Sequence, residues 1–429
     1  MSDMNDLTLE SVNARIEKAA AFFSNKDIVY QTEFFGADNL VKADYCSLYL
    51  KLENLLTTGS FKLRGAYYRM SLLTDDEKIR GVVACSAGNH AQGVALAAQK
   101  LGVKATIFLP TVAPLYKVEA TKRIGGDNVE VKKHGTVYDD TYQAAWEYCQ
   151  QIGATFIHPF NNIDVIAGQG TVGHDIIKQC KSRKLTLDAV IVPVGGGGLI
   201  SGVAAAVKHA NPDCKVYGVQ ASGASGMCRS FKSGKLQDSK YINTFADGIA
   251  VRSPGKLTYE MCKQYVDDIV TVQDDEIATA ILKLLEHHKC VSEGAGAVAV
   301  AAAMHGKLPL HGKRVCAIVS GGNIDINILS RVINRGLLTT GRFTELLIEM
   351  LDKPGSLAEV SAIIANVGAN VVKLSHDQGG KGTKITGCYL SISLETKDRK
   401  HLDEVINALK AKGYKVIYKE SNYEKNHIY

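Results

Sequence analysis

The sequence lacks the features that would indicate a membrane-spanning, nucleic-acid-binding or secreted protein. Its longest apolar stretch, AGAVAVAAAM at residues 295–304, is too short and too rich in alanine to cross a bilayer, and it indicates a buried helix. The net charge is +6, but charges of both signs are interspersed, so no basic block favours a nucleic-acid partner. The first residues, MSDMNDLTLE, are acidic and polar, and we therefore expect no signal peptide.

Cysteine occurs 10 times, but not in the patterns that bind zinc. The sequence has no CxxC pair and no cysteine and histidine at zinc-ligand spacing, so we expect no metal site. Cys85 and Cys316 lie within apolar, strand-like runs, where a small buried thiol is the ordinary interpretation. This usage best fits a reduced protein of the cytoplasm.

Proline is scarce, with 8 residues, whereas glycine is abundant, with 40. Many of the glycines cluster, which indicates tight turns at a site rather than a flexible linker. The chain has 429 residues, of which 46% are hydrophobic, so it can bury large cores in two or three domains of ~150 residues each.

From about residue 81, short apolar runs alternate with longer segments of helical periodicity. The runs typical of strands are GVVACS, KATIFLP, NVEVKK, TFIHPF, DAVIVPV, CKVYGVQ and RVCAIVS. This alternation predicts an α/β fold with parallel sheets. The strands are apolar along their length, as expected when helices cover both faces of a sheet.

The pattern changes after about residue 340. Segments with the character of strand, helix, strand, strand, helix and strand follow one another over residues 341–420. This β-α-β-β-α-β order predicts a ferredoxin-like unit, which is too small to be the catalytic body. We expect an appended module, with the domain boundary near RGLLTTGR at residues 335–342.

One lysine, Lys62, lies in a crowded setting, TTGSFKLRG at residues 57–65. In one interpretation Ser60 caps a helix and Lys62 is a solvated surface charge. In the other, the small and aromatic neighbours partly desolvate the amine. Desolvation would lower the pKa of Lys62 and make the amine a nucleophile or a base.

Three further motifs follow strand-like runs at points where helices begin. In CSAGNHAQG, residues 85–93, either the helix amides form an anion site or the loop is a turn with a cap. In VPVGGGGLISG, residues 192–202, the successive glycines have no packing role, and we interpret them as a phosphate-binding loop. Their spacing is not a dinucleotide fingerprint, and no acidic residue ends the strand KVYGVQ. In IVSGGN, residues 318–323, the serine either caps a helix or points a hydroxyl into a site.

Ligands bind α/β folds at the carboxyl ends of strands, so these motifs predict one crevice that binds a phosphate and a carboxylate beside a lysine. Pyridoxal 5′-phosphate matches that set. The lysine would bind its aldehyde, the glycine amides its phosphate, and polar side chains its ring.

The sequence resembles the fold-type-II pyridoxal-phosphate enzymes of the threonine dehydratase and serine racemase group over about residues 10–335. The motifs ENLLTTGSFKLRGA, SAGNHAQGVA, VGGGGLISG and SGGN occur in that family's order and at its spacing. The resemblance implies a catalytic domain over residues 1–335, made of two open, twisted parallel-sheet subdomains, the smaller and mobile one at about 59–160. Residues 341–420 resemble an ACT domain, through DKPGSLAEV and NVGANVV, which is regulatory in this group.

The resemblance also implies roles for individual residues. Lys62 would be the Schiff-base lysine and the catalytic base, with Phe61 beside the cofactor ring. The other cofactor-binding residues would be Asn89 at the 3′-hydroxyl, Gly195, Gly196, Gly197 and Gly198 at the phosphate, Gly248 at the ring edge and Ser320 at the pyridine nitrogen. The loop that receives the substrate carboxylate would comprise Ser86, Ala87, Gly88, Asn89 and His90. Glu293 is either an acid behind the site or a charge at a helix N-terminus.

Two positions depart from the racemase pattern. Racemisation needs a proton donor on the cofactor face opposite the lysine, and the racemase has a second serine where this chain has Ala87. This difference favours elimination over racemisation. The acidic side chains of the racemase cation site are also missing, because Gln220 and Gly226 stand there, and we expect no metal at that site.

The resemblance implies deaminating dehydration of L-threonine to 2-oxobutanoate and ammonia, and of L-serine to pyruvate. Lys62 would take the α-proton before the β-hydroxyl leaves. One methyl group separates the two substrates, worth only ~1–3 kcal/mol in an apolar pocket, so both are expected to react. The open alternatives are a serine racemase, serine-preferring dehydratase or β-replacement enzyme on the same fold, a non-catalytic amino-acid sensor and, more weakly, a dinucleotide-dependent oxidoreductase.

For the ACT unit, the resemblance implies pairing across a subunit interface in a homodimer or homotetramer. An amino-acid or nucleotide effector would bind at the loop of residues 353–356 and its neighbours, namely Gly355, Ser356, Asn366, Gly368 and Asn370. A dimerisation module with a vacant effector site is the alternative. Isoleucine or valine as the effector would indicate isoleucine biosynthesis, and a nucleotide or no effector would indicate threonine catabolism.

Overall fold

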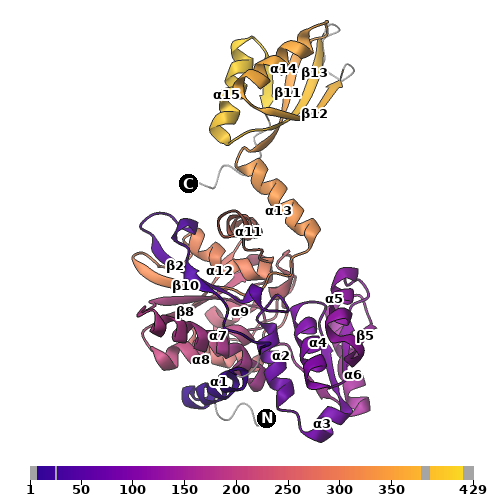
Figure 1. The fold of residues 1–429 in the computed structure, drawn as a ribbon, viewed down its shortest axis with the longest axis vertical. Helices are drawn as coiled ribbons and strands as arrows, with labels where there is room; N and C mark the ends of the chain where they lie inside the picture. The colour runs from indigo at the N-terminus through magenta and orange to yellow at the C-terminus, as the bar shows by residue number, and fades with distance from the viewer. Residues whose placement is uncertain (1–6, 25–26, 378–386, 419–429) are drawn as a thin grey trace. The chain divides into compact units, whose positions relative to one another are not determined.

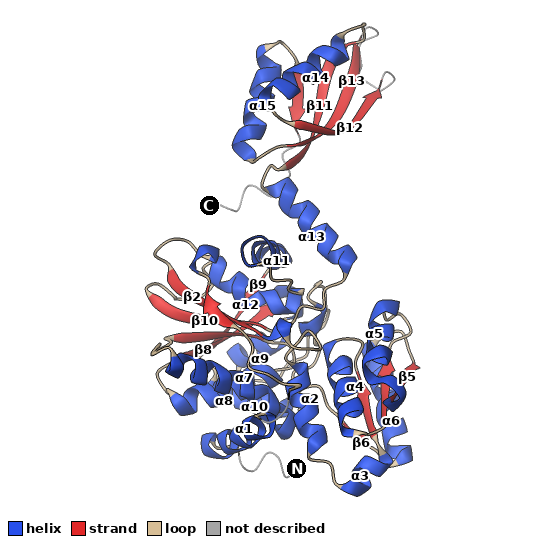
Figure 2. Cartoon of the chain, in the orientation of Figure 1, coloured by secondary structure: helices blue, strands red, loops and turns tan. Residues whose placement is uncertain are grey.

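The structure is a computed structural model and describes residues 7–24, 27–377 and 387–418. The chain divides into two units, residues 1–325 and 326–429. Figure 1 follows the chain from its N-terminus to its C-terminus, and Figure 2 marks the helices and strands. In the part of the chain that the structure describes, no helix is long and apolar enough to cross a membrane.

The larger part of unit 1 is built on a six-stranded sheet of order β1-β2-β10-β7-β8-β9. Its strands are β1 (Phe34–Gly36), β2 (Cys46–Leu52), β7 (Ala189–Pro193), β8 (Lys215–Ala221), β9 (Asp268–Val272) and β10 (Lys313–Val319). Only β1 runs antiparallel to its neighbour, and the other pairs are parallel. The parallel strands confirm the α/β prediction.

Helices cover both faces of this sheet (Figure 2). One side carries α7 (Ile163–Ser182) and α8 (Gly198–Ala210), with α1 (Leu9–Phe23) and α10 (Lys256–Tyr265) packed against them. The other side carries α11 (Asp274–His288) and α12 (Gly294–Met304), and the short helix α9 (Gly226–Ser233) packs beside β9. Every residue of α12 except Met304 is buried, so the longest apolar stretch is a core helix, as predicted.

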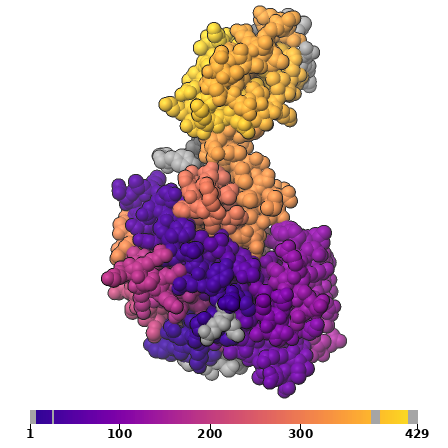
Figure 3. All heavy atoms as spheres, viewed as in Figure 1, coloured from indigo at the N-terminus to yellow at the C-terminus, as the bar shows by residue number. Residues whose placement is uncertain are grey.

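The smaller part of unit 1 has a four-stranded parallel sheet of order β5-β4-β3-β6. Its strands are β3 (Val82–Cys85), β4 (Ala105–Leu109), β5 (Val129–Lys133) and β6 (Thr155–Phe156), and its helices are α2 (Lys62–Ser71), α3 (Asp75–Arg80), α4 (Asn89–Leu101), α5 (Leu115–Gly125) and α6 (Tyr138–Ile152). Alternate residues of β3 pack against α4 and α6, so these helices cover opposite faces. This subdomain forms the purple lobe at the right of unit 1 in Figure 3.

Unit 2 begins with α13 (Ile326–Thr339) and continues with an antiparallel sheet of order β12-β13-β11-β14. The strands are β11 (Phe343–Leu351), β12 (Asn370–Asp377), β13 (Gly387–Glu395) and β14 (Lys415–Tyr418), and the helices are α14 (Ser356–Val367) and α15 (Arg399–Ala411). The helices pack on one face of the sheet over a core that includes Ile348, Leu390 and Leu402. The β-α-β-β-α-β order confirms the ferredoxin-like prediction.

Candidate active site

Two of the predicted motifs meet at the start of helix α2, whose first residue is Lys62. Ser60 pairs with Gly321 in an isolated bridge, and the amide of Phe61 donates to the carbonyl of Ser320 at 3.1 Å. The TGSFK and SGGN motifs are therefore joined through their backbones. Ser60 does not cap α2, because the N-cap residue is Phe61 and it makes no side-chain capping bond.

The amine of Lys62 is half-buried and hydrogen-bonded to protein rather than freely solvated. Its Nζ donates to the carbonyl of Pro159 at 2.8 Å and lies 5.4 Å from the centre of the Phe61 ring. Burial lowers the pKa of Lys62 to about 8, although the carboxyl group of Glu293 opposes the shift. The amine is thus neutral for part of the time near physiological pH, which a nucleophile or base requires. The interpretation of Lys62 as a solvated surface charge is wrong.

Two imidazoles lie near Lys62, the buried His90 and the half-buried His158, and both are neutral. Burial lowers the pKa of His90 to about 3 and that of His158 to about 4, and the charge on Lys62 adds to both shifts. Nδ1 of His158 accepts hydrogen bonds from the amides of Phe160 and Asn161 at 3.2 and 2.9 Å, so its proton is on Nε2. Neither ring therefore adds positive charge beside the lysine.

The predicted phosphate loop, residues 195–198, follows β7 and opens α8. One cavity is lined by this loop together with Phe61, Lys62, Asn89, Gly248, Glu293 and Ser320. Helix α8 has no side-chain cap, which leaves the amides of its first turn available to an anion. The structure thus brings together the predicted cofactor-binding residues from all the motifs.

The expectation that these glycines have no packing role is wrong. A Cβ on Gly196 would lie 2.4 Å from the ring of Phe160, and a Cβ on Gly198 would lie 2.9 Å from the Cβ of the same residue. Gly197 has a φ of +96°, in the left-handed region that favours glycine. Close packing and backbone conformation both exclude larger residues, in addition to any approach of a phosphate.

Asn89, the first residue of α4, is held by two side-chain hydrogen bonds. Its Nδ2 donates to Oε1 of Glu293 at 2.6 Å, and its Oδ1 accepts from Nδ2 of Asn323 at 2.7 Å. Glu293 is the N-cap residue of α12 but makes no side-chain capping bond. Burial, and then the nearby Asp247, raises the pKa of Glu293 to about 7. The geometry favours an acid behind the site over a simple helix-terminal charge.

The predicted carboxylate loop runs from β3 into α4. Ser86, Ala87, Gly88 and Asn89 are half-buried, and a Cβ on Gly88 would meet nothing within 4 Å, so open space lies beside the loop. The amide of Gly88 donates to Oγ of Ser86 at 3.2 Å. The buried ring of His90 instead donates from Nε2 to the carbonyl of Ile157 at 2.8 Å. A contact from His90 to a carboxylate would therefore come from its backbone amide.

Ser320 and Gly248 complete the lining of the cavity. Ser320 is buried, and its Oγ donates weakly to the carbonyl of Ala295 at 3.4 Å. A Cβ on Gly248 would lie 2.8 Å from the Cβ of Ala295 and 3.1 Å from Oε1 of Glu293, so only glycine fits there.

These features fit the parts of pyridoxal 5′-phosphate. The amine of Lys62, with its lowered pKa, fits the aldehyde, and the uncapped helix behind the glycine loop fits the phosphate. The neutral hydroxyl of the buried Ser320 fits the pyridine nitrogen.

The two positions that match the racemase cation site carry no acid. Oε1 of the buried Gln220 accepts from the amide of Cys228 at 2.7 Å, and its Nε2 donates to the carbonyl of Val194 at 3.2 Å. Gly226 begins helix α9. The expectation of no metal at this site remains a prediction.

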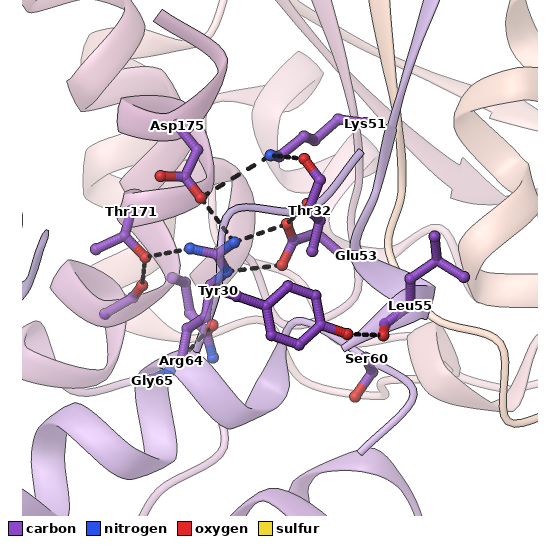
Figure 4. A network of polar contacts seen from close by, with 12 residues as sticks. Tyr30, Thr32, Lys51, Glu53, Leu55, Ser60, Arg64, Gly65, Thr171 and Asp175 are labelled. Atoms are coloured by element: carbon purple, nitrogen blue, oxygen red, sulfur yellow. Dashed lines mark hydrogen bonds and ion pairs between the residues drawn. The ribbon is translucent and has the colours of Figure 1, made fainter. Parts of the chain in front are cut away.

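A buried ion network anchors the helix that carries Lys62 (Figure 4). Arg64 donates from Nε and Nη2 to the two carboxylate oxygens of Glu53, at 2.7 and 2.9 Å. Its Nη2 also donates to Asp175 at 2.8 Å, and its Nη1 donates to Thr171 at 3.1 Å. Asp175 and Thr171 belong to α7, so the network fixes α2 to the larger subdomain.

Several residues of the site were not predicted from the sequence. His158, Pro159 and Phe160 follow β6, and the position of the HPF segment after a strand was the available signal. The ion pair of Lys117 with Asp247 joins α5 of the smaller subdomain to the segment that contains Gly248. That pair had no signal, because its partners are 130 residues apart.

This chain is similar to known proteins over most of its length. It matches the family model described as pyridoxal-phosphate dependent enzyme over residues 26–321 and the ACT domain model over residues 341–413. It is 46% identical over 391 residues to the L-threonine ammonia-lyase of Thermotoga maritima, covering 91% of this chain and 96% of that protein.

Two solved structures show the same fold. The processed form of threonine deaminase isoform 2 from Solanum lycopersicum aligns with a TM-score of 0.70 at 36% identity, covering 77% of this chain and 88% of that one. Maize serine racemase aligns with a TM-score of 0.69 at 33% identity, covering 76% of this chain and 98% of that one.

Proposed function

We propose, on the premise that this chain belongs to the pyridoxal-phosphate dependent enzymes and carries an ACT domain, that it dehydrates and deaminates L-threonine to 2-oxobutanoate and ammonia. L-serine would give pyruvate by the same route. The observation that carries the proposal is the half-buried amine of Lys62, with a pKa of about 8, in the cavity lined by glycines 195–198. The similarity to an L-threonine ammonia-lyase over 96% of that protein supports the same reaction here.

Each part of the site has a distinct task in this proposal. When bound, pyridoxal 5′-phosphate supplies an electron-withdrawing ring that acidifies the Cα proton of the amino acid. Lys62 takes that proton at Nζ, which the carbonyl of Pro159 orients. The loop of residues 195–198 and the first turn of α8 hold the phosphate. Ser320 would face the pyridine nitrogen with a neutral hydroxyl, which would not stabilise a positive charge there.

The carboxylate of the substrate binds at the loop of residues 86–90, beside which the structure has open space. Ala87 offers no side-chain proton donor, so Cα is not reprotonated from the face opposite Lys62. The β-hydroxyl leaves instead as water, with a proton from Lys62 or from the phosphate group, and the enamine released tautomerises and is hydrolysed to the 2-oxo acid and ammonia. A serine racemase or a serine-preferring dehydratase is the second candidate, and the similarity to maize serine racemase is what favours it.

We further propose a catalytic domain of residues 1–335, with its smaller, mobile subdomain at about 59–160, and an ACT regulatory domain of residues 341–420. Gly355, which has a φ of +92°, Ser356, Asn366 and Asn370 would form the effector site. Strand β12 lies at the edge of its sheet and exposes Val372 and Leu374, which supports pairing with a second copy. We place this homodimer or homotetramer in the cytoplasm, where its free cysteines would stay reduced.

The test is steady-state formation of 2-oxo acid and ammonia from L-threonine and from L-serine. Each assay is run with isoleucine, valine, AMP or no effector. The proposal expects equal amounts of both products and activity on both amino acids. Formation of D-serine without 2-oxo acid would replace it with the racemase alternative.

A further inference from the structure

Three side chains that bind metals meet at one end of the sheet in unit 2. A carboxylate oxygen of Asp352, a ring nitrogen of His376 and Sγ of Cys388 all lie within 4.8 Å of one another. Oδ1 of Asp352 and Nε2 of His376 are 3.7 Å apart. Within the described ranges, this is the one group of three such side chains with that spacing.

Strand register explains why these residues converge. Cys388 on β13 lies opposite Met350 on β11, and His376 on β12 lies opposite Leu390 on β13. Residues opposite each other point to the same face of a sheet, and Met350 and Leu390 are buried in the core beneath the helices. Asp352 follows Met350 by two residues and continues that face. All three side chains thus belong to the helix-covered side of the sheet, at its end.

The three residues differ in exposure in a way that suits an open site. Cys388 is fully buried and forms the floor, with its Sγ 3.7 Å from the carbonyl of Met350. The side chains of His376 and Asp352 are 35% and 40% exposed and form the mouth. An ion bound there would contact three protein groups and keep one position open to solvent.

The chemistry of the donors selects the ion. Imidazole, carboxylate and thiolate are the ligands of Zn²⁺, and three protein ligands plus water complete a tetrahedron. Mg²⁺ and Ca²⁺ require mainly oxygen ligands, which this group does not supply. Without an ion, burial and then the charge of Asp352 raise the pKa of the Cys388 thiol. Coordination replaces the thiol proton, which passes to solvent as the sulfur–metal bond forms.

We propose that Asp352, His376 and Cys388 bind one Zn²⁺ ion per chain, with water as the fourth ligand. The ion would join the ends of β11, β12 and β13 beside the loop of residues 353–356. No metal site was expected here, because the ligands come from β12, β13 and the residue after β11 and have no sequence spacing in common. It is independent of the reaction proposed for unit 1.

The experiment uses the purified full-length holoenzyme after dialysis against a chelator and then against metal-free buffer. Zn²⁺ is titrated in competition with a chromophoric chelator, and bound metal is counted by mass spectrometry. Co²⁺ then serves as the spectroscopic probe, through its d–d bands and its sulfur-to-metal absorption in difference spectra. We expect one ion per chain, a tetrahedral Co²⁺ spectrum with a thiolate contribution, and displacement of Co²⁺ by Zn²⁺.

The variants are Cys388→Ser, His376→Ala and Asp352→Asn. Losing a residue that only hydrogen-bonds to a metal ligand weakens metal binding roughly 10- to 100-fold. Each of these variants loses a ligand itself and should therefore weaken Zn²⁺ binding by more than that. Cys46→Ser, which changes a partly exposed cysteine in unit 1, is the matched control and should bind as the wild type does. His376 and Asp352 lie at the surface, so their variants test the site even if Cys388→Ser impairs folding. Less than one ion per chain, or unchanged binding in His376→Ala and Asp352→Asn, would overturn the proposal and leave an exposed ion pair above a buried thiol.

Discussion

Nδ2 of Asn89 donates a 2.6 Å hydrogen bond to Oε1 of Glu293, and this bond joins the first residue of α4 to the residue that precedes α12. The two helices belong to different subdomains of unit 1. Glu293 is buried, and both it and Lys62 line the cavity. The carboxyl group therefore sets the orientation of the Asn89 amide that we assign to the cofactor hydroxyl.

Replacing Glu293 with glutamine keeps a hydrogen-bond acceptor for Asn89 but removes the ionisable group. The pKa of Glu293 rises from 4.5 to about 7 on folding, so the folded state binds more protons than the unfolded state between these values. The carboxyl group therefore lowers the free energy of unfolding as pH rises through that window. We expect Glu293→Gln to show a smaller decline. Above pH 7, its free energy of unfolding should exceed that of the wild type by at most about 3 kcal/mol. Urea unfolding of the cofactor-free chain across the window measures the effect.

The control for this measurement is Glu404→Gln, at an exposed position on α15 in unit 2. It should follow the wild-type dependence on pH. Equal slopes for Glu293→Gln and the wild type would show that Glu293 is ionised in the folded chain throughout this range.

Replacing Lys62 with alanine should abolish turnover and the absorbance of the lysine-bound cofactor. Among the described residues that line the cavity, no other side chain carries an amine that could replace Nζ of Lys62 beside the carbonyl of Pro159. We expect a loss of at least about 10³-fold in kcat. Lys100→Ala, at an exposed position on α4, should leave both unchanged. Retention of turnover and absorbance in Lys62→Ala would refute the assignment.

Replacing Ala87 with serine adds a hydroxyl to the loop between β3 and α4, where the side chain is half-buried. If the wild-type site fails to racemise because it has no proton donor on the face opposite Lys62, Ala87→Ser should form D-serine from L-serine. The wild type should form 2-oxo acid alone. Chiral analysis of the residual serine measures the ratio of racemisation to elimination. Ala87→Gly is the matched control without a hydroxyl. Comparable rates of racemisation and elimination in the wild type would contradict the argument from Ala87.

The sequence predicted the site best where residues with a chemical role lie at the ends of predicted strands. The loop of residues 195–198 and Ser320 each follow a strand, so strand ends predict that they meet, and one cavity contains both together with Lys62, which begins α2. The sequence was misleading about the reason for the glycines, because Phe160, which excludes a Cβ at Gly196, comes from the separate segment between β6 and α7. His90 was expected in the carboxylate loop, but it lies in the first turn of α4, and the carbonyl of Ile157 that binds its ring depends on tertiary packing.

Contacts between distant segments could not be predicted from local pattern. Arg64 lies two residues after Lys62 in the same motif, yet its partner Asp175 is 111 residues further along the chain. The same is true of His376 and Cys388, which antiparallel register brings together from β12 and β13, and of Asp352, which directly follows β11. Periodicity predicts which face a residue occupies, whereas the neighbours on that face depend on how the strands pair.

The buried pair of Glu53 and Arg64 is expected to hold α2, and with it Lys62, in place (Figure 4). Both side chains are at most 2% exposed. Removing one charge leaves the other buried without its partner, so Glu53→Gln and Arg64→Met should each cost about 3–5 kcal/mol of unfolding free energy. The double variant should cost less than their sum, because it leaves neither charge of the pair behind. Arg15→Met, which breaks the exposed pair with Asp164, should cost no more than about 1 kcal/mol of unfolding free energy.

Urea unfolding measures all four variants, and the absorbance of the lysine-bound cofactor reports the position of Lys62. Additive losses in the double variant would show that the two residues act separately.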